Sequence, residues 1–466
     1  MKMRWSFRFI ITAVLLANHA GAKPRLIVLT DIGGDPDDQQ SMIRLMLYSN
    51  EFEIEGLIAS ASGTPGELGK AVVKPHLIAQ IVRAYGEVRG NLIMHESGYP
   101  TAEYLSARIK SGNPYRGAKF IGPGNDTEGS NWIISVVDKA DARPVNIAIW
   151  GGQTDLAQAL WRVRENRSKQ ELERFVAKLR IHDIADQDKL FTWIHKNFPN
   201  LFYILNRART DRDKRTAVFR GMYLGGDESL TSRRWIDEHV RMNHGPLGAL
   251  YPTRTWTSPN PNGVLKEGDT PSWFYFLSNG LGDCDHPEYG GWGGRFHRES
   301  GQLFCDAEDR LDVPPATAWK WNADKFNRNG RITVYRWRRH FQNDFQARMD
   351  WCTMDFDRAN HPPVAGVAGP LRRSIRAGDR IVLDASSSSD PDGDELSYEW
   401  FHYPEPGSFD GRLELTNADS DRVSLAAPSV SRDCTAHIIL VVSDNGTPNL
   451  FGYKRIVLNI SKQEHE

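Results

Sequence analysis

The segment LTDIGGDPDDQQS, residues 29–41, places four aspartates within eight positions, directly after a short apolar run. Asp31, Asp35, Asp37 and Asp38 offer hard oxygen donors on a backbone that glycine and proline turn sharply. Grouped carboxylates repel one another unless a cation neutralises them, and Ca²⁺ takes about six to eight oxygen ligands. Helix capping explains one or two aspartates, because a helix start favours negative charge, but it does not explain the whole set. The segment therefore predicts a metal site.

The elements that must position these aspartates are predicted from the apolar runs. Continuous apolar runs are typical of buried parallel strands, and the amphipathic stretches between them are typical of helices. This alternation predicts an open, mostly parallel α/β sheet, which binds ligands at the carboxyl ends of its strands. The acidic segment follows the first such end. The expected strands are RLIVLTD (25–31), FEIEGLIAS (52–60), VNIAIWGG (145–152), AKLRIHDIA (177–185) and NLFYIL (200–205), and the clearest helices are DDQQSMIRLMLYSN (37–50) and TDLAQALWRVREN (154–166).

The sequence pattern changes after ANHPPVAGVAGP, residues 359–370. Beyond this segment, apolar and polar residues alternate, and clusters of turn residues separate the alternating stretches. Such a pattern is typical of an all-β sandwich of the immunoglobulin type, and roughly 100 residues is an ordinary domain size. We therefore expect an α/β domain over residues 23–357 and a β-sandwich domain over residues 358–466.

The first 22 residues have the pattern of a targeting segment. Basic residues precede the short apolar run IITAVLLA, and small residues follow it up to Ala22. This predicts a secretory signal peptide cleaved after Ala22 and a secreted or periplasmic protein. The apolar run is too short to span a bilayer. In an oxidising compartment the four cysteines could form one or two disulfides, or they could be buried free thiols.

The overall charge limits the class of partner. The formal net charge of −1 gives no support for a nucleic-acid or anionic-membrane partner, because phosphate binding needs a basic excess. The 14 tryptophans could stack on sugars, although core packing accounts for most rings of this kind. We therefore expect a small-molecule or carbohydrate partner, and the sequence does not indicate an oligomeric state.

The acidic segment resembles the signature D-x-D-x-G-x-D-D of the inosine–uridine-preferring nucleoside hydrolases, which hold Ca²⁺ in an open α/β domain. IWGGQTDLAQAL (149–160) and KEGDTPSW (266–273) resemble two further segments of that family. The whole chain is more similar to a group of exported bacterial proteins, named as cellulose-binding, that join a nucleoside-hydrolase-like domain to a C-terminal immunoglobulin-like domain. The segments that carry this second resemblance are TDIGGDPDDQQSMIRLMLYSN (30–50), EGDTPSWFYFLSNGLGDCDHPEYGGWGGR (267–295) and DASSSSDPDGDELSYEW (384–400).

The resemblance implies a ligand set for Ca²⁺. Asp38, Asp269 and the Trp150 carbonyl would hold the ion together with Asp31 or Asp35. The bound ion would lower the pKa of a water molecule and anchor two neighbouring sugar hydroxyls. Cleavage would then pass through an oxocarbenium-like state, as in other glycoside hydrolysis.

One position departs from the nucleoside-hydrolase signature. Asp31, Asp37 and Asp38 match its first, third and fourth aspartates, but its second aspartate, the proposed general base of the family, falls on Gly33. Asp35 falls where the family has glycine. The expected base is therefore Asp35, or else Asp31, and it must reach within about 3 Å of the bound water.

Other polar residues could bind substrate or protonate a leaving group. His244 lies in the Gly- and Pro-rich segment NHGPLGALYP (243–252), although a single histidine is more often structural. Trp292 lies in CDHPEYGGWGGRF (284–296), which could stack on a sugar or could be a loop packed by its own aromatic rings. The donor candidates are His182, Asp183, Asp186, Asp227 and His244. The predicted catalytic residues are Asp31, Asp35 and His244, and the predicted substrate-binding residues are Asp37, His182, Asp183, Asp186 and Trp292.

Two functions remain open from the sequence. The first is an exported, calcium-dependent hydrolase of N-glycosidic or related bonds, which the retained aspartates favour. The alternative is a carbohydrate-binding protein, for example a cellulose-binding one, that keeps the scaffold without turnover, and Gly33 at the base position favours it.

Overall fold

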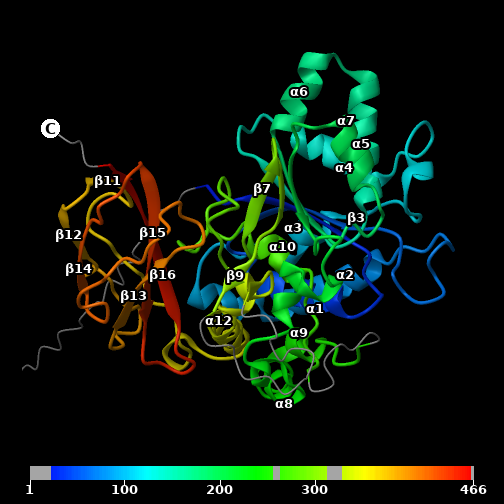
Figure 1. The fold of residues 1–466 in the computed structure, drawn as a ribbon. Coiled ribbons are helices and arrows are strands. Elements are labelled where there is room, and N and C mark those ends of the chain that lie inside the picture. Colours follow the sequence, from blue (N-terminus) through cyan, green and yellow to red (C-terminus); the bar gives the residue numbers. More distant parts are fainter. Residues whose placement is uncertain (1–21, 256–262, 312–327, 463–466) are drawn as a thin grey trace, which may run out of the picture.

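The computed structural model describes residues 22–255, 263–311 and 328–462, and its larger part is an α/β structure around one sheet (Figure 1). The strands of this sheet are β1 (Arg25–Thr30), β2 (Glu53–Ala59), β3 (Ile109–Ser111), β4 (Val145–Ile149), β5 (Leu179–Ile184), β6 (Phe202–Asn206), β7 (Phe296–Ser300) and β8 (Leu303–Asp306). Their order is β3-β2-β1-β4-β5-β6-β8-β7, and every neighbouring pair is parallel except β7–β8. The predicted open, mostly parallel sheet is confirmed.

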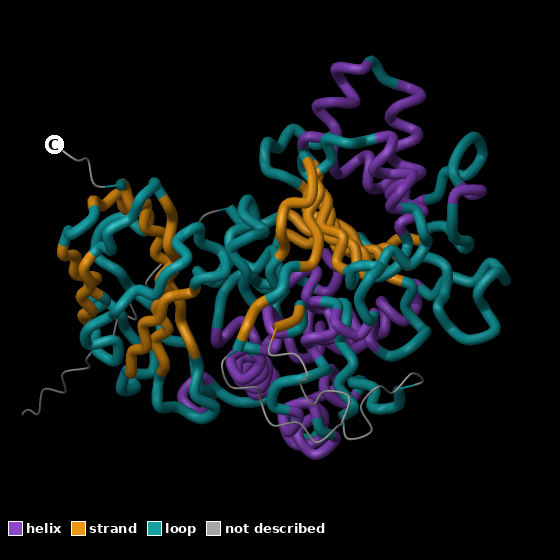
Figure 2. The backbone as a smooth tube through the Cα atoms, in the orientation of Figure 1, coloured by secondary structure: helices purple, strands orange, loops and turns teal. Residues whose placement is uncertain are grey.

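Helices cover both faces of this sheet, and the strands lie between the two helical layers in Figure 2. Side chains alternate across β1: Leu26 and Val28 face one apolar core, and Ile27 and Leu29 face the other. On the first face lie α1 (Asp37–Leu47), α2 (Pro75–His95), α9 (Gly245–Ala249), α10 (Thr270–Phe274) and α12 (Arg338–Asp350). On the second face lie α4 (Glu128–Val137), α5 (Gln153–Asn166), α6 (Lys169–Ala177) and α7 (Phe191–Asn197). Shorter elements are α3 (Ala102–Ser106), α8 (Arg233–Ile236), α11 (Ile332–Tyr335), β9 (Asp309–Arg310) and β10 (Arg328–Asn329).

The strand order reverses beside β1. The chain passes from β1 to β2 and β3 on one side, and then returns to β4 on the other side. The backbone N–H of Trp150, just after β4, donates to the carbonyl of Leu29 in β1 at 2.8 Å. The carboxyl ends of β1 and β4 therefore lie side by side, at the kind of crevice where open α/β sheets bind ligands.

The C-terminal part is all β and lies at the left in Figure 1. A four-stranded sheet has the order β11-β16-β15-β13, and a two-stranded sheet pairs β12 with β14. Trp400 and Leu440 belong to an apolar core between these strands. The strands are β11 (Arg372–Arg376), β12 (Arg380–Asp384), β13 (Ser397–Tyr403), β14 (Arg422–Ala426), β15 (Cys434–Ser443) and β16 (Phe451–Ser461). The expectation of a second, all-β unit is confirmed.

One apolar core runs from the α/β part into the C-terminal part. Tyr453 of β16 packs against Trp292 and Trp337, with ring centroids 6.1 Å apart in both pairs. The buried carboxylate of Asp309 joins the two parts as well. It accepts hydrogen bonds from Arg295 at 2.7 Å, from Arg336 at 2.7 Å and from the Tyr403 hydroxyl at 2.5 Å. The C-terminal strands are thus packed onto the α/β part through apolar and ionic contacts together.

The cysteines and the expected signal peptide can be compared with the described residues. All four cysteines are free thiols, of which Cys352 and Cys434 are buried and Cys284 and Cys305 are half-buried. Of the two alternatives for the cysteines, the free thiols hold. Within the described ranges, no helix combines the length and the apolar character needed to cross a membrane. Residues 1–21 of the expected signal peptide lie outside the described residues.

Candidate metal site

Three carboxylates meet at the carboxyl ends of β1 and β4. Asp37 and Asp38 lie in the first turn of α1, and Asp269 lies immediately before α10. One oxygen from each of the three lies within 4.8 Å of the others. Asp269 is only 2 % exposed, and its Oδ2 atom is buried without a hydrogen-bond partner. An unpartnered buried carboxylate oxygen beside two further carboxylates fits a divalent cation such as Ca²⁺.

A buried ion pair holds Asp269 opposite α1. Arg44 of α1 binds both carboxylate oxygens of Glu267, at 2.5 and 3.0 Å. Glu267 also accepts hydrogen bonds from Tyr251 at 2.6 Å and from Thr270 at 2.9 Å. These contacts fix the segment that leads into α10, so that the carboxylates from the two helices face one another.

The electrostatics of the three carboxylates show that their charges are not balanced by the protein alone. Burial, followed by repulsion from Asp31 and Asp37, raises the pKa of Asp38 well above its usual range. Burial, followed by repulsion from Asp37 and Asp38, does the same to the pKa of Asp269. Burial and the neighbouring carboxylates raise the pKa of Asp37 to about 7, although Lys266 opposes this shift. A bound cation would relieve this cost.

Asp31 lies at the end of β1 and belongs to the same acidic group. The guanidinium of Arg116 forms an ion pair with its carboxylate and lies 3.6 Å from Asp188. Asp38 accepts a hydrogen bond from Thr30, the last residue of β1. Asp31 is therefore adjacent to the three carboxylates, but its own carboxylate is already paired with the Arg116 guanidinium.

Trp150 is next to this site but its carbonyl already has a partner. Its indole N–H donates to the Ser272 hydroxyl at 2.8 Å, and that hydroxyl donates to the Asp269 carbonyl at 2.6 Å. The side chain of Gln187 donates to the Trp150 carbonyl. The indole thus ties α10 to the end of β4, and Gln187 occupies the carbonyl that the resemblance offered to calcium.

The place of the missing base is filled by a lysine. Gly33 has φ +104°, a conformation that side-chain-bearing residues rarely adopt, and a Cβ atom there would lie 2.6 Å from Cδ of Lys74. The Lys74 ammonium forms an ion pair with Glu67 at 2.7 Å and donates to Thr64 at 2.7 Å. An aspartate at position 33 would require both a strained backbone and a displaced lysine.

Asp35, the expected replacement for that base, forms an ion pair with Lys266. The Asp35 side chain is 18 % exposed, and the Lys266 side chain is 6 % exposed. Asp35 therefore turns inward toward the acidic group instead of pointing to solvent, but a lysine lies against its carboxylate.

The second group of predicted residues lies around β5. His182 is buried beside Asn206 and the edges of Tyr275 and Phe296, and burial lowers its pKa to about 3, so that it is neutral. Asp183 accepts from Gln153 and from the Tyr203 hydroxyl, both at 2.8 Å, and burial raises its pKa well above the usual range.

Asp186 belongs to the same network as Asp183. It accepts from Gln153 at 3.1 Å and pairs with Arg207 at 2.9 Å. Asp188 links this network toward the acidic group, because its backbone N–H donates to the side-chain carbonyl of Gln153 at 3.1 Å and its carboxylate faces Arg116. None of the described hydrogen bonds or ion pairs joins Asp183 or Asp186 directly to the three carboxylates.

His244 and Asp227 also have local partners. His244 lies just before α9 and contacts Asp350 of α12 at 2.9 Å. Asp227 caps a short helical turn by accepting from Ser229 at 2.9 Å. Among the described contacts, neither residue touches the acidic group.

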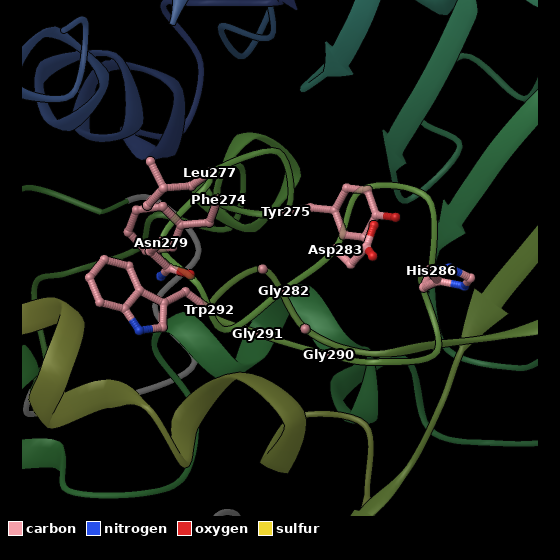
Figure 3. Close-up of a pocket in the computed structure, with 12 residues that line it drawn as sticks. Phe274, Tyr275, Leu277, Asn279, Gly282, Asp283, His286, Gly290, Gly291 and Trp292 are labelled. Carbon is pink, nitrogen blue, oxygen red and sulfur yellow. The ribbon is translucent and has the colours of Figure 1, made fainter. Parts of the chain in front are cut away.

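Trp292 lies inside the molecule and not on its surface. It is 4 % exposed and packs against Phe274, Phe341 and Tyr453. Figure 3 shows Trp292 beside Phe274 and Leu277, around a hollow that has room for about one water molecule. Trp292 is thus a packed core ring, as in the second of the two alternatives for this tract, but the rings it packs against come from α10, α12 and β16 instead of from the tract itself.

Sequence reasoning did not find the cations of this site. Lys266 stands three residues before Asp269 in the segment that carried the resemblance, so its proximity could have been noticed. Arg116 and Lys74 come from loops without a recognisable pattern, and their contacts with the acidic segment span 85 and 41 residues respectively (116 − 31 and 74 − 33).

Comparison with known proteins agrees with the architecture of the sheet. Residues 25–296, more than half of the chain, match the family described as "Cellulose-binding Sde182, nucleoside hydrolase-like domain". Residues 380–460 match the family described as "Cellulose-binding protein Sde0182, C-terminal domain". No curated protein was found to match the chain.

The solved structures include one similar over nearly the whole chain. It is a nucleoside hydrolase-related hypothetical protein from Saccharophagus degradans, described as associated with carbohydrate metabolism. It shares 34 % sequence identity and a TM-score of 0.77, and the match covers 94 % of this chain and 100 % of that one. A PKD domain from the KIAA 1837 protein matches 21 % of this chain and 87 % of its own, at 26 % identity and a TM-score of 0.17.

Proposed function

Because the chain belongs to the family of Sde182 cellulose-binding proteins with a nucleoside hydrolase-like domain, we propose that it is an exported, cation-dependent carbohydrate-binding protein without hydrolytic turnover. The family description names cellulose as the ligand, and the predicted signal peptide is consistent with an extracellular polysaccharide. The proposed binding site is the acidic group at the carboxyl ends of β1 and β4.

The observation that carries this proposal is that lysine side chains occupy the space where a general base would act. A general base must hold an unengaged basic atom within hydrogen-bond reach of the attacking water. At Gly33 that place contains the Lys74 side chain, and the nearest substitute, Asp35, is paired with Lys266. A lysine side chain therefore lies beside each of the two positions from which the hydrolase reaction would need a proton acceptor.

Asp37, Asp38 and Asp269 are the residues that would hold Ca²⁺, and Asp31 would contribute from the side that Arg116 shares. A bound Ca²⁺ supplies an anchor for two neighbouring hydroxyls of a sugar ring. Asp37 is the half-buried member of the three and offers a carboxylate to a sugar hydroxyl at the edge of the site. Recognition would therefore act through hydroxyl groups, since the described Trp292 ring is buried in the core.

Titration calorimetry with cello-oligosaccharides tests the proposal, using the mature chain in CaCl₂ and again after removal of divalent ions with EDTA. We expect binding with Ca²⁺ and at least tenfold weaker binding after EDTA or in Asp38→Asn. The matched control is Asp211→Asn, an exposed carboxylate paired with Arg209. Sugar binding that neither EDTA nor Asp38→Asn weakens would refute a cation-dependent site.

A calcium-dependent hydrolase is the second candidate. It is favoured by the presence of Asp31, Asp37, Asp38 and Asp269 together, because binding by surface contacts alone needs no buried carboxylate group. A screen of nucleosides and plant-cell-wall glycosides, with and without Ca²⁺, separates the two. Turnover that requires both Ca²⁺ and Asp38 would replace the binding proposal with the hydrolase.

A further inference from the structure

Lys266 is a buried cation beside the acidic group. Its ammonium contacts the Asp35 carboxylate, and the side chain is only 6 % exposed. Its charge also lowers the pKa of Asp37 and, more weakly, that of Asp269, both of which belong to the three-carboxylate group. Lys266 therefore acts electrostatically on the ligands of the proposed ion.

Among the described residues, Lys266 is a counter-charge for the carboxylates on the Asp35 side of the site. Five carboxylates gather here: Asp31, Asp35, Asp37, Asp38 and Asp269. Arg116 lies at the Asp31 end, and Asp188 shares its charge. Lys266 lies at the opposite end, between Asp35 and the segment of Asp269. A divalent ion would thus bind next to an existing positive charge.

The backbone of Lys266 is fixed by hydrogen bonds, whereas its ammonium has a second possible contact besides Asp35. Its N–H donates to the side-chain carbonyl of Gln40 at 2.7 Å, and the following residue, Glu267, is bound by Arg44. The ammonium lies 5.7 Å from the centre of the Tyr223 ring, within the range of a cation–π contact. The four-carbon stem of lysine allows the ammonium to move without the backbone.

From this arrangement we infer that Lys266 is an internal competitor of the divalent cation and sets the cation affinity of the site. Without a metal, its ammonium partly neutralises the carboxylates. When a divalent ion enters, repulsion between the two positive charges weakens the ion's binding, and the ammonium shifts from Asp35 toward Tyr223. The inference rests on the proposed cation site, and it identifies the residue that tunes that site.

Calcium titration calorimetry on the full mature chain, stripped with EDTA and without sugar, tests the inference. Lys266→Met should bind Ca²⁺ about tenfold more tightly or better, because a nearby positive charge is gone. Lys266→Arg keeps the charge and should bind like the wild type. The matched control is Lys139→Met, which removes a lysine paired with the buried Glu55 in β2. It should leave calcium affinity unchanged.

Thermal unfolding gives a second readout. In EDTA, Lys266→Met should unfold at a lower temperature than the wild type, and saturating Ca²⁺ should raise it by more degrees than it raises the wild type. If the methionine variant does not fold, Lys266→Gln takes its place, with the same expected gain in affinity.

The outcomes separate this inference from the proposed function. Tighter Ca²⁺ binding in Lys266→Met, without a gain in the control variant, supports the inference. If the wild type binds no Ca²⁺ in the same experiment, the inference still holds, but the proposed calcium dependence of the native protein is refuted. Equal or weaker binding in Lys266→Met overturns the inference while wild-type calcium binding preserves the proposed function. A gain in Lys139→Met as well, or no binding in any variant, also overturns the inference.

Discussion

Two buried aspartate groups in this chain differ in how their charges are balanced. At the contact between the α/β part and the C-terminal strands, Asp309 is fully buried against Arg295, Arg336 and the Tyr403 hydroxyl. Burial alone would raise the pKa of Asp309, but the two arginines outweigh it and the pKa is lowered. At the carboxyl ends of β1 and β4, Asp269 is buried to the same degree, yet its pKa is raised well above its usual range.

The difference distinguishes an aspartate that holds the structure together from aspartates arranged for a ligand. Asp309 has a cation for each carboxylate oxygen, so nothing further is needed there. Asp269 keeps one buried oxygen without a partner, beside Asp37 and Asp38. Buried acidic groups whose partners are incomplete are candidates for binding sites, whereas complete ones are structural.

The largest effect is expected from breaking the balanced group. Asp309→Asn leaves Arg295 and Arg336 buried without a carboxylate, so we expect the free energy of unfolding to fall by about 3–5 kcal/mol. Urea denaturation followed by tryptophan fluorescence measures it. The exposed pair Arg209–Asp211 is the control, because solvent screens its charges and Asp211→Asn should leave the stability close to that of the wild type. A loss at Asp309 as small as that at Asp211 would contradict the distinction.

Opposite pH dependences should separate the two groups. In EDTA, folded Asp37 keeps its proton up to about pH 7 while the unfolded chain loses it near 3.8. The folded state therefore binds more protons, and stability should fall as the pH rises from about 4 to 7, by about 2 kcal/mol after allowance for solvent screening. Asp309, with its lowered pKa, contributes stability above the unfolded value, and this is lost as the pH falls below about 4.

Denaturation midpoints measured at several pH values check this expectation, with Asp37→Asn as the variant that should reduce the fall between pH 4 and 7. Asp38 and Asp269, whose pKa values are raised as well, account for part of the fall that remains. Saturating Ca²⁺ should reduce the fall further than Asp37→Asn does, since metal ligands are held deprotonated. Metal-free stability that rises steadily over this range would show that the acidic group is balanced after all.

A smaller gain in stability is expected when the unbalanced group loses one charge. Asp269→Asn removes a buried carboxylate that repels Asp37 and Asp38, so the metal-free protein should become more stable by about 1 kcal/mol. The same variant should lose the calcium-dependent rise in unfolding temperature. Calorimetric scans with and without Ca²⁺ measure both effects. Destabilisation of the metal-free variant would place Asp269 with Asp309, among the structural aspartates.

The smallest effect concerns the position of the missing base. Gly33→Asp should cost about 1 kcal/mol of stability because of the positive φ angle, and it should not create nucleoside hydrolysis, since Lys74 fills the space. Gly33→Ala controls for the backbone cost alone. Calcium-dependent release of base from inosine or uridine by Gly33→Asp would show that only the carboxylate was missing.

The sequence was sufficient to predict the sheet and the acidic segment. The buried strands carry continuous apolar runs, which predict a parallel sheet. Asp31, Asp37 and Asp38 are close together along the chain and follow the first strand, so their position at the carboxyl end of that strand can be predicted from the local sequence. Asp269 is 231 residues away from Asp38 and entered only through a resemblance (269 − 38). Its contact with α1 depends on the Arg44–Glu267 pair, which no local pattern predicts.

The partners of the charged residues could not be predicted in the same way. Asp35 is the expected base because it lies two residues after Gly33, which stands at the base position of the nucleoside-hydrolase signature. Whether its carboxylate meets a water molecule or Lys266 is decided by side-chain packing between distant segments. The environments of His182 and Trp292 could not be predicted either. The sequence around the His182 strand, or around the glycine-rich loop of Trp292, is the same whether the ring faces a ligand or the core, and both rings are buried.

The apolar core shared by Trp292, Trp337 and Tyr453 has a mechanical consequence. Many polysaccharide-binding modules hang on flexible linkers, so their orientation relative to the rest of the protein is averaged. Here the C-terminal strands pack directly against the α/β part, so the two parts keep one relative orientation. If the C-terminal strands rest on a surface, the acidic group is presented at one fixed angle, and a truncation before β11 would expose the rings of this core to water.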